Sequence, residues 1–117
     1  MMHPRFNAWR NYHISHPEVF YLFLGYARQA HDAGRKRIGS RLIGERIRWF
    51  ANVERRGDDD WLINDHYWPY YARLAMLVDD RLQGIFSRRD TKFDATDEEI
   101  LEVHKDTLCV FYRKEPR

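Results

Sequence analysis

The residues best suited to contact a nucleic acid crowd together between positions 66 and 73. This segment combines one histidine and one arginine with four aromatic residues, namely His66, Tyr67, Trp68, Tyr70, Tyr71 and Arg73. Aromatic rings stack on bases and sugars, and an arginine reaches phosphates or guanine edges. Tyr67 and Tyr71 share a helical stripe with Leu74 that fits a core. The residues predicted to face outward are therefore Trp68, Tyr70 and Arg73.

A basic segment precedes this aromatic group. Residues 35–56 hold eight Lys and Arg against two Glu, and the basic residues are Arg35, Lys36, Arg37, Arg41, Arg46, Arg48, Arg55 and Arg56. Residues 1–56 carry a net charge of +7 and residues 57–117 a net charge of −5. A cluster of this kind attracts phosphates, and Arg41, Arg46 and Arg48 are its predicted phosphate contacts. The alternative is a solvated helix face that the acidic half of the same chain neutralises.

The sequence favours a protein without catalytic or metal chemistry. The six histidines show neither a His-x-x-x-His pair nor a cysteine partner, which argues against zinc. Asp58, Asp59 and Asp60 read as a solvated acidic turn, although carboxylates of this kind also suit magnesium. A glycine-rich phosphate loop, a Gly-x-Ser-x-Gly elbow and the Glu-x-Lys pattern of nucleases are all missing from the sequence. We therefore predict no enzyme activity, no cofactor and no functional metal.

Three predicted helices position these groups. The first begins at a capping box formed by Ser15 and Glu18, and it ends at Gly34 in a left-handed cap. The second starts with Ser40 as its N-cap and runs to about Glu54. Its apolar residues Ile43, Ile47, Phe50 and Val53 share one helix face. The third is capped by Asn64 or Asp65 and ends near Asp79 and Asp80.

The C-terminal part of the chain reads as a small β element. Residues 84–88 and 106–113 have strand patterns, and a short helix opens between them at Thr96. The fold class predicted is mainly α with this C-terminal β element, in the element order of a winged helix-turn-helix. One domain over residues 1–117 is expected, with a helical core at 15–80 and a strand, helix and strand at 81–117.

Composition predicts a cytoplasmic protein that does not enter a membrane. The chain has no run of about 18 apolar residues, and residues 1–5 lack the apolar core of a signal peptide. The single Cys109 lies in an apolar run, so we interpret it as a small buried residue and not as a nucleophile.

Residues 16–89 resemble a family of short phage and prophage proteins that has no assigned activity. The resemblance is carried by Gly34, Arg35, Lys36, Ile38 and Gly39, by residues 45–49, by Ile63 and Asn64, and by residues 70–73, whereas Pro69 departs from the pattern. It implies a viral origin. Short phage proteins often bind DNA, or bind and disable a host protein such as a defence nuclease, a CRISPR complex or a polymerase.

Two functions follow as expectations. In the first, Arg41, Arg46, Arg48 and Arg73 contact nucleic-acid phosphates while Trp68 or Tyr70 packs on a sugar or base. In the second, the protein binds a host protein, either through the Trp68 and Tyr70 surface or through an acidic face that mimics a nucleic acid. Exposed aromatic residues also make a homodimer compatible with the sequence.

Overall fold

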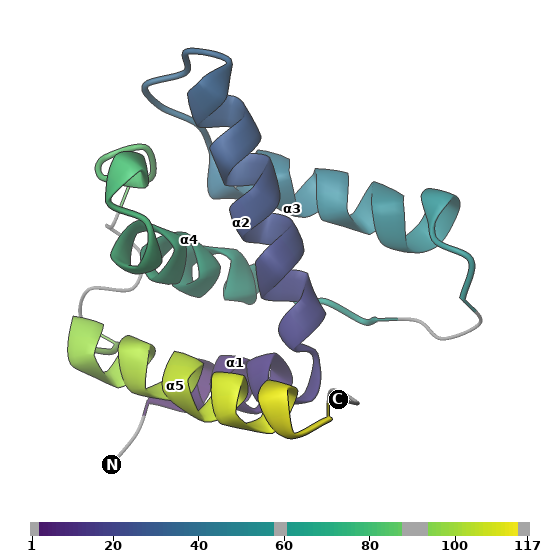
Figure 1. Ribbon diagram of the computed structural model, residues 1–117, viewed down its shortest axis with the longest axis vertical. Helices are drawn as coiled ribbons and strands as arrows, with labels where there is room; N and C mark the ends of the chain where they lie inside the picture. The colour runs from purple at the N-terminus through teal and green to yellow at the C-terminus, as the bar shows by residue number, and fades with distance from the viewer. Residues whose placement is uncertain (1–2, 58–60, 88–93, 115–117) are drawn as a thin grey trace.

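In the described part of the chain, all the regular secondary structure is helical. The computed structural model describes residues 3–57, 61–87 and 94–114, with side chains of the last segment as far as residue 105. Its α-helices are α1 (Pro4–Ser15), α2 (Pro17–Asp32), α3 (Ser40–Trp49), α4 (Trp68–Val78) and α5 (Asp97–Lys114) (Figure 1). A π-helical turn, η1 (Phe50–Glu54), prolongs α3, and the 3₁₀ turns η2 (Asp65–Tyr67) and η3 (Asp80–Leu82) flank α4.

The helices pack around α2 and α4. Helices α1 and α5 lie side by side at one end of the molecule (Figure 1). Helix α4 packs against α5 on one side and against α2 and α3 on the other. Helix α3 and η1 extend from α2 away from α1 and α5, so that they form a projecting arm (Figure 1). We call residues 40–54, which comprise α3 and η1, the arm.

The end of α2 is set as the sequence predicted. Gly34 has a φ of 88°, in the left-handed region that favours glycine. Its amide donates to the His31 carbonyl at 2.9 Å, and the Arg35 amide donates to the Ala30 carbonyl at 3.1 Å. These two bonds make a Schellman motif, which satisfies carbonyls that the last turn would leave without donors. The predicted left-handed cap at Gly34 is confirmed.

The predicted start of the first helix was wrong. Ser15 is the last residue of α1, a helix that the sequence reading missed, and its hydroxyl donates to the Asn11 carbonyl at 3.0 Å. Helix α2 starts at Pro17 with His16 as its N-cap residue. Pro17 is accommodated there because the first helical position needs no amide donor.

A capping box starts α5. The Thr96 amide donates to Glu99 Oε1 at 3.0 Å, and the Glu99 amide donates to Thr96 Oγ1 at 3.1 Å. The pKa of Glu99 is held below its ordinary value, mainly by its bond to the Thr96 backbone. A helix beginning here was predicted from the sequence, although as a short one, and α5 continues to Lys114.

The predicted C-terminal β element is contradicted, and with it the winged-helix order. Residues 106–113 are helical, because α5 gains more by packing along α1 and α4 than its β-prone residues gain in a strand. Residues 84–87 form no strand, and Arg88 lies outside the described residues. Gly84 turns the chain with a φ of 80°, and Phe86 packs 5.4 Å from the ring of Phe23.

The core is a cluster of aromatic rings around Tyr71. Its ring lies between 5.8 and 6.4 Å from five other rings, which belong to Trp9, His13, Phe20, Phe23 and Trp68. These rings come from α1, α2 and α4, and each is at most 1% exposed. The three helices are therefore held together mainly by aromatic packing, which contributes beyond simple area burial.

Within this core, His13 makes stability depend on pH. It is fully buried, its ring stacks on Trp9 and faces Tyr71 and His104, and neither ring nitrogen bonds to the described residues. Burial, and secondarily the positive charge of His104, lowers the pKa of His13 to about 3. The imidazole of His13 is therefore protonated below about pH 6.5 in the unfolded chain but stays neutral in the folded protein. The free energy of unfolding consequently falls as the pH drops from about 6.5 toward 3.

We expect the free energy of unfolding to be about 2 kcal/mol smaller at about pH 5 than at about pH 7. Urea unfolding at both pH values measures this difference. His13→Phe keeps an aromatic ring in the core and should remove most of the dependence, leaving a smaller part that comes from His104, whose pKa burial also lowers. Equal pH dependence in the variant and the parent protein would show that His13 is accessible to protons in the native state.

Candidate protein-interaction surface

The aromatic residues predicted to face outward on the third helix are buried, so that prediction was wrong. Trp68 and Tyr70 are each 1% exposed. The Tyr70 ring stacks on Trp9 of α1 at 5.4 Å, and its hydroxyl donates to Asp94 at 3.0 Å. Burial and the bond to Asp94 raise the pKa of Tyr70. Neither ring is available to stack on a base or to anchor an interface.

Arg73 is also inside the protein. It is 3% exposed, and its guanidinium donates to the Ala95 carbonyl at 2.8 Å and to Asp97 at 2.7 Å. The side chain therefore joins α4 to the start of α5. A buried arginine that already binds a carboxylate has no free donor face for a phosphate at the surface.

The three predicted arginines of α3 differ from one another. Arg46 pairs with Glu54 at 3.1 Å and lies over the ring of Tyr26. Arg48 pairs with Asp65 at 2.6 Å and with Glu45 at 2.9 Å.

Arg41 is exposed, and within the described residues it makes no ion pair. The hydrogen bond from Arg48 holds the pKa of Asp65 below its ordinary value, and the charge of Arg41 adds to this effect. Three of the six predicted site residues, Arg41, Trp68 and Tyr70, line one hollow of about 330 Å³. The other three, Arg46, Arg48 and Arg73, do not line it, so the six do not form one phosphate-binding surface.

The arm carries exposed apolar side chains that the sequence reading missed. Leu42, Trp49 and Val53 are 64%, 57% and 59% exposed. Their spacing of seven and then four residues places them on one helix face, and we call them the apolar stripe. The prediction that Val53 belongs to the buried stripe was wrong, because only Ile43 and Ile47 of that set are fully buried. The spacing of the exposed residues was a usable signal in the sequence.

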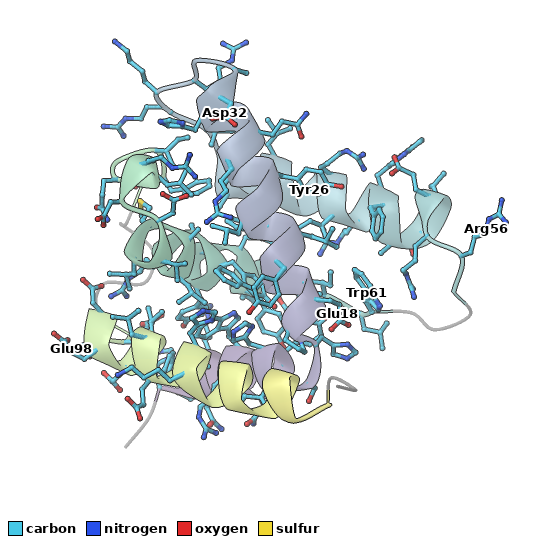
Figure 2. The ribbon with its side chains drawn as sticks, viewed as in Figure 1. Glu18, Tyr26, Asp32, Arg56, Trp61 and Glu98 are labelled. Carbon is cyan, nitrogen blue, oxygen red and sulfur yellow. The ribbon has the colours of Figure 1, made fainter. Side chains whose placement is uncertain are left out.

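The inner face of the arm is fixed to the body. The Phe50 ring packs 6.1 Å from Trp61, the Arg55 guanidinium lies 4.5 Å above the Trp61 ring, and Arg48 donates to the Ile63 carbonyl at 2.7 Å. The Tyr12 hydroxyl in turn donates to the Trp61 carbonyl at 2.6 Å, which ties this loop to α1. Figure 2 shows Trp61 beneath the arm, and Arg56 just beyond the far end of the arm. The apolar stripe is therefore presented on a preorganised support.

Leu62 adds a further exposed apolar side chain at the edge of the arm. It is 78% exposed and has a φ of 50°, a conformation that is unusual for a non-glycine residue. It lines a hollow of about 220 Å³ together with Ala51 and Asn52. Strain at an exposed leucine is a feature that often accompanies binding sites.

A groove of about 390 Å³ lies between α2 and α3, beside the apolar stripe. Its lining is largely apolar and includes Tyr26, Ala30, Ala33, Ile38, Leu42 and Ile43. Leu42 belongs to both the groove and the apolar stripe, so the two form one continuous surface. In Figure 2, Tyr26 lies where α2 crosses the arm.

Among the described residues, two of the acidic residues of the second half are paired with arginines. Asp79 pairs with Arg28 and with Arg81 at 2.8 Å each, and these arginines hold its pKa well below its ordinary value. Asp97 pairs with Arg73. Asp58 to Asp60 lie outside the described residues. The expectation of an acidic surface that mimics a nucleic acid stays a prediction, which these two pairs do not favour.

In comparisons with protein-family models, with curated proteins and with solved structures, nothing matches this chain. No helix among the described residues is long and apolar enough to cross a bilayer. In the same residues, no three His, Cys, Asp or Glu side chains come together in a way that would hold a metal ion. Any functional assignment therefore depends on the surface itself.

Proposed function

We propose that this is a non-catalytic protein that acts by binding another protein through the outer face of its arm. The observation that carries the proposal is the apolar stripe, in which three large apolar side chains are each more than half exposed on one face of a fixed helix. Isolated exposed apolar residues are common, but several large ones on one face of a helix favour a contact surface. An exposed tryptophan at its centre, Trp49, is the residue type most often found as an interface anchor.

The charges around the arm support a protein partner over a nucleic acid. Arg46, Arg48 and Arg73 are each neutralised by a carboxylate of the same chain, at N–O distances of 3.1 Å or less. Phosphate contacts would have to break these pairs, with little net gain in electrostatic energy. The resemblance to short phage proteins favours a protein of the bacterial host as the partner.

A matched pair of variants tests the proposal. The arm variant Leu42→Ser, Trp49→Ser and Val53→Ser removes the apolar stripe, and the control Tyr21→Ser and Val78→Ser removes apolar residues that are 38% and 39% exposed outside the arm. Host proteins captured by each are compared quantitatively, and the affinity of the purified partner is then measured. We expect the control to bind like the parent protein and the arm variant to bind at least about 100-fold more weakly.

Three outcomes would contradict the proposal. In the first, the arm variant and the control capture the same proteins with the same affinity. In the second, the parent protein sediments as a dimer and the arm variant as a monomer, which would make a second copy of the chain the partner. The third is binding to duplex DNA near physiological salt that the arm variant retains, since such binding would arise from the basic residues alone.

A further inference from the structure

The groove between α2 and α3 has a cationic rim at one end. The connection from α2 to α3 contains Arg35, Lys36 and Arg37, which are exposed and make no ion pair within the described residues. Arg35 itself lines the groove, as does Arg46 at the other side. An apolar floor thus lies directly beside Arg35, the first of three consecutive basic residues.

An apolar groove beside positive charges favours one class of ligand over the others. A nucleic-acid backbone would satisfy the cations, but its sugars and phosphates carry no large apolar group that would fill the groove lined by Ala30, Ile38 and Leu42. An apolar peptide would fill the floor, but it would leave the cations without counter-charges. A segment with apolar residues on one side and carboxylates on the other meets both requirements.

We propose that the groove receives an amphipathic helix of the partner whose polar positions are acidic. This inference rests on the proposed function, because it names the partner segment that continues from the apolar stripe into the groove through Leu42. Helices dock in this way by inserting residues at i, i+4 and i+7 into an apolar groove. The carboxylates of the partner helix face Arg35, Lys36 and Arg37 and fix its direction along the groove.

The probe is a displayed library of helical peptides with leucine at i, i+4 and i+7 and with Glu, Lys, Gln and Ala in equal shares elsewhere. Selection on the parent protein is expected to enrich Glu over Lys by about tenfold or more. Selection on the charge-reversal variant Arg35→Glu, Lys36→Glu and Arg37→Glu should enrich Lys instead. Selection on Ala33→Phe, whose ring occupies the groove from its exposed rim, should enrich nothing.

Several results would overturn the inference. On the parent protein, these are no enrichment of any peptide or equal recovery of Glu and Lys. On the variants, they are a preference for Glu that persists after charge reversal, or an enrichment that Ala33→Phe leaves unchanged. Circular dichroism of each variant verifies that the fold is intact.

Different results contradict the proposed function and the proposed acidic helix. If the arm variant keeps the captured partner, the proposed function fails whatever the library yields. If the arm variant loses the partner but the charge-reversal variant binds it unchanged, only the acidic helix is excluded.

Discussion

Replacing Gly44 by alanine is expected to destabilise the protein by about 3 kcal/mol or more. Gly44 lies on the inner face of α3, and a Cβ atom there would be 2.6 Å from both Cδ2 and Nε1 of the Trp68 indole. This ring cannot move away, because it is 1% exposed and packs against Phe23 and Tyr71. The arm would have to lift from α4. Chemical denaturation of Gly44→Ala and the parent protein measures the loss.

Gly25→Ala is the matched control. Gly25 is an exposed residue within α2, and nothing lies within 4 Å of the Cβ that alanine would add. Because alanine has a higher helix propensity than glycine, this variant should be more stable by about 0.5 to 1 kcal/mol. Two variants with the same chemical change and opposite effects would establish close approach as the cause. A stability loss below 1 kcal/mol for Gly44→Ala would show that α3 does not pack on Trp68 as described.

Asp97→Ala is expected to destabilise the protein by about 2 to 3 kcal/mol, because it leaves the charge of Arg73 buried without its carboxylate. The pair has an N–O distance of 2.7 Å, with Arg73 3% and Asp97 34% exposed. The partial exposure of Asp97 places the effect at the low end of what breaking a buried pair costs. Thermal and urea unfolding provide the measurement.

Glu98→Ala separates this pair from a general effect of charge in the first turn of α5. Glu98 also places a negative charge near the start of the helix, but it is exposed and makes no ion pair among the described residues. It should lose only the interaction with the helix dipole, about 0.5 kcal/mol. Equal losses for Asp97→Ala and Glu98→Ala would rule out a specific role for the Arg73 pair.

Local signals in the sequence predicted several helix ends well. The Gly34 cap at the end of α2, the start of α5 at Thr96 and the end of α4 near Asp79 each depend on a few neighbouring residues. Such signals act within one turn, so they can be read without knowledge of the rest of the fold. The extent of α5 could not be read in this way, because the packing of α5 against α1 and α4 depends on helices that lie far away in the sequence.

The misplacement of Tyr70 and Arg73 has a single physical origin, whereas Trp68 is buried against α2 and α3. Without α1 and the full length of α5, the predicted three-helix core left one side of the third helix open to solvent, and Trp68, Tyr70 and Arg73 were assigned to that side. In the structure α1 covers Tyr70 with Trp9, and α5 covers Arg73 with Asp97. A helix that is apolar on nearly all sides, as α4 is, belongs at the centre of a fold, and this pattern was available in the sequence.

Photo-crosslinking from the arm tests the proposed function most directly, because it detects contact with the partner. A photo-crosslinking amino acid is placed at Trp49 in the apolar stripe, at Ala33 on the groove rim and at Glu98 on the far side of the molecule, and the protein is irradiated in its host cells. Figure 2 shows Glu98 remote from the arm. We expect one host protein to crosslink from positions 49 and 33 and not from position 98. Crosslinks to that protein from position 98 alone would contradict the proposed function.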